Sequence, residues 1–141
     1  MTNGWLLAGG VMSGVAALLH LGCILGGPDW YRFFGAGERT ARLVERGDIG
    51  PTVITLGIAA VLGLWSAYAL SGAGLITRLP LLRLGLIAIT AVYLLRAVAL
   101  PMMIRTMPDR SMAFLIWSSA IVLLIGTVHA VGLIRGWRQL G

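Results

Sequence analysis

The sequence predicts an all-α integral membrane protein, with four transmembrane helices in an up-down bundle and a short interfacial helix in the first connection. Three observations predict this fold class. The chain of 141 residues is 58% hydrophobic and 11% charged, whereas soluble domains carry about 25% charged residues. Its apolar residues fall into four long runs separated by Gly, Pro and charged residues. Each run reaches the roughly 20 residues that a helix needs to cross the hydrocarbon core. We therefore treat residues 1–141 as a single membrane domain.

The first predicted span covers residues 5–26 and is followed by Gly27 and Pro28, a strong helix stop. A signal peptide would also place an apolar run here. This run, however, lacks a basic flank and exceeds the usual length of a signal peptide's apolar region. The sequence LHLGC, which ends at Cys23, has His20 where a lipoprotein cleavage box needs an apolar residue. We therefore expect a retained span without a lipid on Cys23.

The second predicted span covers residues 51–71. It begins at Pro51, because proline is favourable at the first position of a helix. It ends where the sequence SGAG, residues 71–74, supplies two glycines.

The third and fourth predicted spans cover residues 79–104 and 112–134. We expect Pro101 to kink or shorten the last turn of the third span, since proline lacks the backbone N–H that an interior helical position needs. The fourth span follows the sequence PDRS, in which Asp109 or Ser111 is suited to cap its first turn.

The first connection, residues 28–47, is the only long one. It is rich in aromatic residues, and then carries arginines and apolar residues at helical spacing: Trp30, Tyr31, Phe33 and Phe34, then Arg39, Ala41, Arg42, Val44 and Arg46. This pattern favours an amphipathic helix that lies in the membrane interface. A solvated surface loop is the alternative, because the four arginines of this segment stand beside four acids once Asp48, which directly follows it, is counted.

Four spans place both termini on one side of the membrane. All five acids then fall on the opposite side: Asp29, Glu38, Glu45, Asp48 and Asp109. The eleven basic residues are all arginine, and those near span ends are divided between the two sides. Their distribution does not settle the orientation under the positive-inside rule.

Arg96 lies within an otherwise apolar run, YLLRAVALP, residues 93–101. An unpaired charge at mid-bilayer costs at least about 2.5 kcal/mol, so such a residue faces the bundle interior, pairs with an acid or extends to the interface. Arg96 is expected roughly 12 Å from the acidic end of its span. We therefore expect the first connection to fold onto the bundle and to set Glu38, or failing that Asp29, against Arg96. The alternative is an Arg96 that reaches the headgroups with its long aliphatic stem.

Other polar residues are expected at the same depth. Tyr93 precedes Arg96 by three residues and shares its helix face. With polar residues from the first two spans and the first connection, Tyr93 and Arg96 give one predicted ligand-binding cluster: Arg96, Glu38, Tyr93, His20, Cys23 and Thr55. The alternative to a binding site is that these residues only pack the helices together, with their hydroxyls hydrogen-bonded within the bundle.

No metal and no cofactor is predicted. His20 and His129 are expected to differ in depth by roughly 16 Å, so one haem iron cannot take both. We expect His129 to be a buried imidazole bonded to a neighbouring helix. Several methionines fall on the acidic side with Cys23, but methionine is also the ordinary filler of apolar gaps, and a repeated copper motif is absent from the sequence. The basic and aromatic stripes of a nucleic-acid-binding protein are also absent.

Two functions remain open. In the first, the protein binds, or acts on, a membrane-dissolved amphiphile such as a lipid or a quinone, because the planar donors of Arg96 suit a phosphate, a carboxylate or a carbonyl. In the second, it is a non-catalytic subunit or an oligomeric scaffold of a larger membrane complex. In outline the chain is similar to small four-span bacterial proteins, including those of the DoxX kind. This resemblance implies only a shape, and it assigns no role to any residue. Separately, we expect the protein to lie in the bacterial inner membrane.

Overall fold

The computed structural model describes residues 2–141. This part of the chain is all helical, without strands. Its six helices are α1 (Gly4–Phe33), α2 (Glu38–Glu45), α3 (Gly50–Gly72), α4 (Leu82–Val98), α5 (Leu100–Thr106) and α6 (Met112–Leu140).

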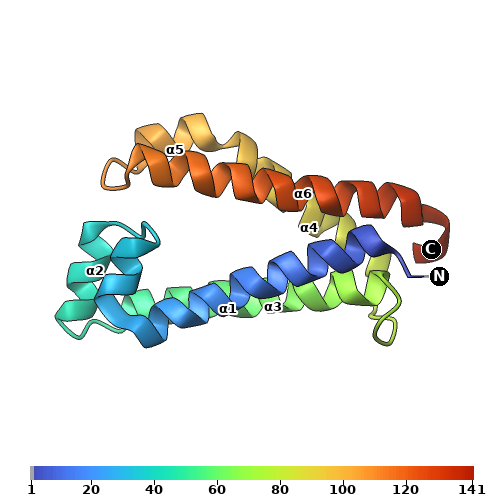
Figure 1. Cartoon of the computed structure of the whole chain (residues 1–141), viewed down its shortest axis with the longest axis horizontal. Coiled ribbons are helices and arrows are strands. Elements are labelled where there is room, and N and C mark those ends of the chain that lie inside the picture. Colours follow the sequence, from blue (N-terminus) through green and yellow to red (C-terminus); the bar gives the residue numbers. More distant parts are fainter. Residues whose placement is uncertain (1) are drawn as a thin grey trace.

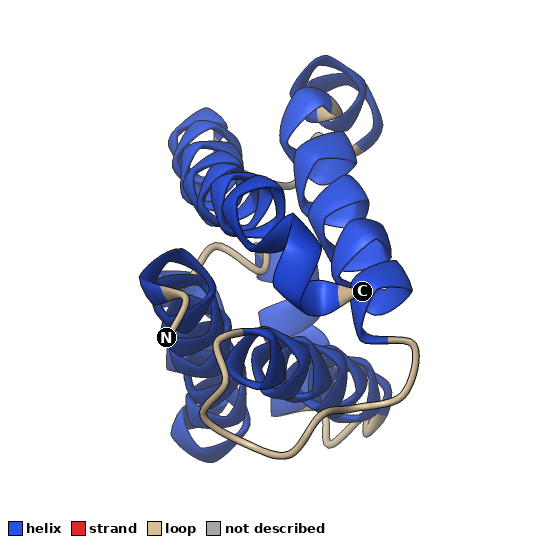
Figure 2. Cartoon of the chain, turned by 90° about the vertical axis from the view of Figure 1, so that its right-hand side faces the viewer, coloured by secondary structure: helices blue, strands red, loops and turns tan. Residues whose placement is uncertain are grey.

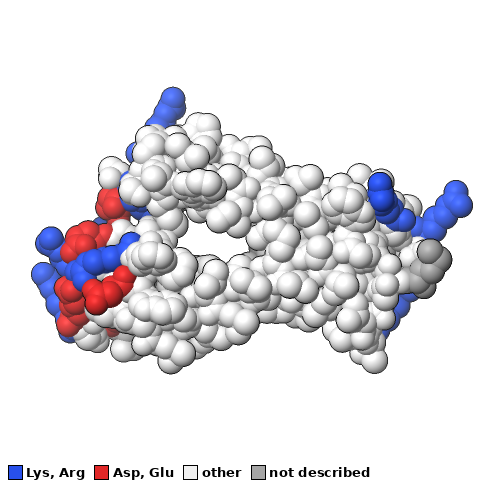
Figure 3. Space-filling model, viewed as in Figure 1, with Lys and Arg blue, Asp and Glu red and all other residues white. Residues whose placement is uncertain are grey.

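The long helices form two pairs, α1 beside α3 and α4 beside α6 (Figure 1). The N- and C-terminal ends of the chain lie together at one end of the molecule, which we call the terminal end (Figures 1 and 2). There the Asn3 amide donates to the Gly132 carbonyl at 2.8 Å. The acidic side chains gather at the opposite end, which we call the acidic end (Figure 3). The predicted separation of termini and acids is confirmed by this arrangement.

The long helices have the length and composition of membrane spans. Helices α1, α3 and α6 each qualify alone, and α4 with α5 adds a fourth if this bent pair counts as one span. Large apolar side chains point outward along them, as Leu25 does with 89% of its surface exposed. This is the surface expected of a membrane protein, because lipid tails replace water around it.

The α4–α5 bend is the kink predicted at Pro101. The two helices meet at 58° around Ala99. Because Pro101 has no N–H, the Ala97 carbonyl loses its helical donor and the axis turns here. The predicted cap of the fourth span is also confirmed, since the Ser111 hydroxyl accepts a hydrogen bond from the Phe114 N–H at 3.1 Å.

The first helix breaks at Gly27, as predicted, but a second short helical piece that was not expected follows it. Gly27 adopts a left-handed φ of 67°, which breaks the helix, but Pro28 restarts it and α1 continues to Phe33. Glycine tolerates this conformation, and proline is pre-set for the first turn of a helix. Consequently α1 bends at Gly27 and carries Trp30 to Phe33 on a second short helical piece (Figure 1).

The buried core is divided along the molecule. Near the terminal end, Leu6 and Leu86 are fully buried among residues of four helices. In the middle, Tyr93 packs with Ile89 and Ile125. In lipid, such contacts act by close packing rather than by removing apolar surface from water.

Candidate functional site

Arg96 of α4 is held by two neutral hydroxyls. Its Nη1 donates to Ser119 Oγ at 3.1 Å and its Nη2 to Ser118 Oγ at 3.2 Å, both on α6. The side chain is half-buried. Within residues 2–141, every ion pair closer than 4 Å involves Arg32 or Arg42, so no carboxylate neutralises Arg96. A charge at this position in a span is costly without an anionic neighbour.

The predicted pairing of Arg96 with Glu38 is wrong, and so is the second choice, Asp29. Glu38 accepts from Arg32 Nε at 2.9 Å and from Arg42 Nε at 3.1 Å. Asp29 lies 3.4 Å from Arg32. The second helical piece of α1 places Arg32 beside the acids of the first connection, and Glu38 and Glu45 pair with it instead of with Arg96.

The same contacts shift the titration of Glu38. Hydrogen bonds from Arg32 and then Arg42 lower the pKa of the Glu38 carboxyl from 4.5 to about 2. Glu38 is thus an ionised carboxylate that fastens α2 to the end of α1, and it is not part of the Arg96 site.

Tyr93 lies one turn before Arg96 on α4, as predicted, but its hydroxyl bonds elsewhere. It shares a buried hydrogen bond of 2.8 Å with Ser13 of α1. Its ring meets Trp65 edge-on, with 4.9 Å between centroids, and lies 5.3 Å from the ring of His129. Tyr93 therefore joins α1 to the α4–α6 pair next to the Arg96 site.

An opening lies between the two helix pairs. Figure 3 shows it closer to the acidic end than to the terminal end. Towards the termini the pairs are joined by the bond between Ser13 and Tyr93. Towards the acidic end they meet again where Gly35 lies directly against the Phe114 ring and its carbonyl accepts from Arg110 at 3.4 Å.

Helix geometry gives the side of the bundle on which Arg96 lies. It follows Tyr93 by three residues, about 4.5 Å along α4 towards the acidic end. Ser118 shares a face of α6 with His129, since eleven residues make about three turns. His129 faces α1, because its ring lies against Gly9. The guanidinium therefore bridges α4 and α6 on the side that faces α1.

His20 of α1 is another predicted residue, and it lies roughly 6 Å further towards the acidic end than Arg96. It follows Ser13 by seven residues, about 10 Å along α1, and its side chain is half-buried. Its Nδ1 donates to the Ala16 carbonyl of its own helix at 2.7 Å. This bond leaves Nε2 as the ring nitrogen that can accept a proton or a hydrogen bond.

The structure does not bring Cys23 and Thr55 to Arg96. Cys23 is buried in an apolar cluster with Tyr31 and Ala41. Thr55 accepts a hydrogen bond of 3.0 Å from the Tyr31 hydroxyl. Both residues pack the extension of α1 and the first connection against the bundle, which is the structural role that was the alternative for them.

Sequence reasoning missed two features of the site. The role of Ser119 was not expected, although a Ser-Ser pair in an apolar span is a signal in itself. His129 was expected to bond to a neighbouring helix, but its Nδ1 donates to Ile125 of its own helix at 2.9 Å. Its Nε2 is buried without a hydrogen-bond partner among residues 2–141.

Three comparisons with known proteins were made, and no family model, curated protein or solved structure matches this chain.

Proposed function

We propose that this protein binds, or acts on, a membrane-dissolved amphiphile with an anionic or carbonyl head, such as a lipid or a quinone. Arg96 holds the head, and the opening between the helix pairs admits it. In this proposal α4 and α5 form one bent span, so four helices cross the inner membrane of a bacterium. The helix α2 then lies in the interface.

The observation that carries the proposal is the charge balance around Arg96. The two serines that bind it are neutral, and the ion pairs among residues 2–141 all involve other arginines. A guanidinium has more N–H donors than these two bonds use. A phosphate, a carboxylate or a quinone carbonyl would satisfy the remaining donors in the planar geometry that arginine favours.

The surroundings suit an amphiphile. The opening lies between helices whose outer surfaces are apolar, so a ligand dissolved in the bilayer can enter sideways without crossing water. Burial of its tail between helices and of its head against Arg96 would follow the usual pattern of a mostly apolar site with a few placed polar groups.

Binding is better supported than catalysis. A reaction would need a nucleophile or an acid-base pair beside the head. Cys23 is buried in another cluster and Glu38 is bonded to two arginines. Of the predicted acid-base residues, His20 remains, and it lies roughly 6 Å from the level of Arg96 along the bundle.

Replacement of Arg96 tests this proposal. Native mass spectrometry of the detergent-extracted protein reports bound amphiphile and stoichiometry together. We expect the wild type to retain an amphiphile and Arg96→Gln to lose it. Arg105→Gln is the matched control, because it removes the same charge from an exposed position at the acidic end. Circular dichroism checks that both variants remain helical. Equal retention by wild type and Arg96→Gln would refute the proposal.

A self-associating subunit is the second candidate. One observation favours it: Gly57 and Gly63 of α3 are exposed, with open space where a Cβ would stand. Ala60 lies between them on the same outward surface, and small residues let helices approach closely in lipid. Gly57→Leu with Gly63→Leu would then reduce the oligomer mass in native mass spectrometry and leave amphiphile retention unchanged. An unchanged mass would argue against this candidate.

A further inference from the structure

The short helix α2 separates its charges onto two faces. At about 100° per residue, one face carries Glu38, Arg42 and Glu45, and the next carries Arg39, Leu43 and Arg46. The remaining face packs inward through Ala41 and Val44 against Cys23 and Tyr31. The helix is therefore fixed to α1 by its apolar side, and its two charged faces are presented outward.

The acids of α2 are already engaged. Arg32 pairs with Glu38 at 2.9 Å and with Glu45 at 2.7 Å, and Arg42 pairs with Glu38 at 3.1 Å. Arg39 and Arg46 are exposed and take part in none of the ion pairs within residues 2–141. The second face of α2 therefore carries uncompensated positive charge.

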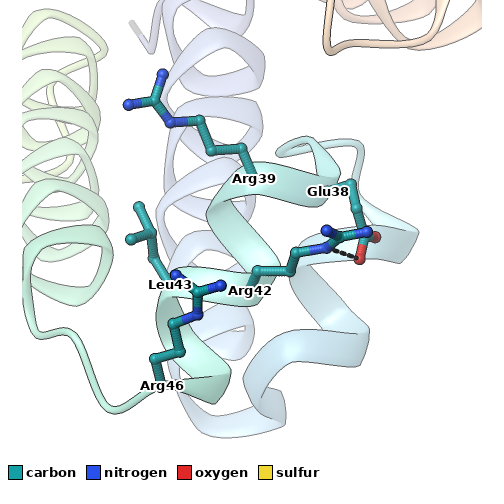
Figure 4. Close-up of a pocket in the computed structure, with 5 residues that line it drawn as sticks. All are labelled: Glu38, Arg39, Arg42, Leu43 and Arg46. Atoms are coloured by element: carbon teal, nitrogen blue, oxygen red, sulfur yellow. Dashed lines mark hydrogen bonds and ion pairs between the residues drawn. The ribbon is translucent and has the colours of Figure 1, made fainter.

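An open pocket of about 550 Å³ lies over this face, lined by Glu38, Arg39, Arg42, Leu43 and Arg46. Figure 4 shows the side chains of Arg39 and Arg46 above and below Leu43, while Arg42 points towards Glu38. The pocket thus combines an apolar contact with two cationic side chains that have no carboxylate partner.

We propose that this α2 pocket binds the phosphate headgroup of an anionic phospholipid, with Arg39 and Arg46 on the phosphate and Leu43 against the adjoining apolar part. Arginine suits phosphate because its planar donors match the phosphate oxygens. The site is separate from Arg96, and it depends only on the chain lying in a membrane.

The position of α2 points to a lipid rather than to a soluble anion. It joins α1 to α3, so it lies where these helices reach the membrane surface. Ile49 follows Arg46 by three residues and is 74% exposed, and Val53, one turn further on α3, is 60% exposed. These exposed apolar residues follow α2 in the chain and lead into the apolar helix α3, so lipid tails beside α3 would meet an apolar surface.

The test uses the full-length protein in a neutral detergent, titrated with phosphatidylglycerol or phosphatidylcholine and followed by native mass spectrometry. The variant is Arg39→Gln with Arg46→Gln, and the control is Arg105→Gln with Arg138→Gln. The control removes the same charge from exposed arginines of α5 and α6. Both pairs are placed in an Arg96→Gln background, so that loss of the intramembrane site cannot be mistaken for loss of this one.

We expect the affinity for phosphatidylglycerol to fall roughly fivefold per arginine removed from α2, hence roughly 25-fold for the pair. The control should bind as its parent does, and phosphatidylcholine should bind weakly to all forms. An unchanged affinity in the α2 variant would overturn the proposal. So would an equal loss in the control, because that would indicate net charge alone. Displacement of the lipid by an equal concentration of inorganic phosphate would show that the pocket takes the free ion instead.

Discussion

At the scale of single residues, Gly9 of α1 packs directly against the buried ring of His129 on α6. A Cβ on Gly9 would lie 2.7 Å from His129 Cε1 and 2.8 Å from its Nδ1. The ring cannot simply turn away, because it is fully buried and Nδ1 is bonded to Ile125. Gly9 is therefore required by the approach of the two helices.

We predict that Gly9→Ala destabilises the protein by about 1–3 kcal/mol, the usual cost of overpacking a core. Gly57→Ala is the control, because the space around Gly57 is open and alanine is the better helix former. Thermal unfolding followed by circular dichroism in detergent compares the two. Adding His129→Ala should remove most of the penalty of Gly9→Ala. Equal melting temperatures for Gly9→Ala and Gly57→Ala would contradict this packing.

The sequence was sufficient to single out Arg96, because a charge inside an apolar run demands an explanation at any depth. The sequence could not show which residues bind the Arg96 side chain. The acids pair with the arginine that lies nearest to them in the fold. Arg32 is that arginine because helical structure resumes after Gly27 and places it beside Glu38. A pair of neutral serines on another helix, Ser118 and Ser119, leaves no signal that connects it to Arg96 before the helices are assembled.

At the scale of elements, α2 is fastened to the end of α1 by the carboxylate of Glu38. Because the folded-state pKa of Glu38, about 2, lies below its ordinary value of 4.5, this contact stabilises the folded state above about pH 4.5. The stabilisation declines as the pH falls and is lost below about pH 2.

We predict a midpoint near pH 2 for the Glu38 carboxyl in a carbon-detected NMR titration of the micellar protein, matching its lowered pKa. The protection factors of the α2 amides, which correct for the pH dependence of intrinsic exchange, should fall over the same range, because the contact with Arg32 is then lost. Glu38→Gln should weaken this pH dependence of the α2 protection factors. A midpoint near 4.5, the ordinary pKa, would show that Glu38 is not held by the arginines.

The glycine and proline residues of the sequence identified the helices better than they located the ends of those helices. Proline at position 51 marked the first turn of α3, and Pro101 marked the bend between α4 and α5. The same rules placed a stop at Gly27 and Pro28, where the structure has a kink. A Gly-Pro pair breaks one helix and also suits the start of the next. Whether a second helix follows depends on whether the next residues pack against the rest of the protein, as Tyr31 does against Cys23.

At the scale of the whole molecule, the number of membrane crossings depends on the bent pair α4–α5. If it crosses once, the loop at Thr77 and the loop at Asp109 lie on opposite sides of the membrane. If it does not cross, both loops lie on the same side. In a Cys23→Ala background, Thr77→Cys and Asp109→Cys should differ in labelling by an impermeant maleimide applied to intact spheroplasts. Equal labelling of the two from outside would exclude the four-span arrangement.

Composition and hydropathy determine the membrane class and the all-helical fold, because only helices or closed barrels satisfy their backbone in lipid. The opening between the two helix pairs could not be predicted in the same way. The opening lies between two separate contacts of the helix pairs. One contact joins Ser13 to Tyr93, and the other joins Gly35 to Phe114. These are contacts between residues distant in sequence, and each was found only in the assembled molecule.

We propose that Arg96 presents its charge to a ligand inside the membrane. An experimental structure of the protein in lipid nanodiscs would reveal such a ligand. We expect density for a head group about 3 Å from the guanidinium, the usual hydrogen-bond distance, with its tail in the opening between the helix pairs. An Arg96 side chain extended into the lipid, with the opening closed by neighbouring side chains, would contradict it.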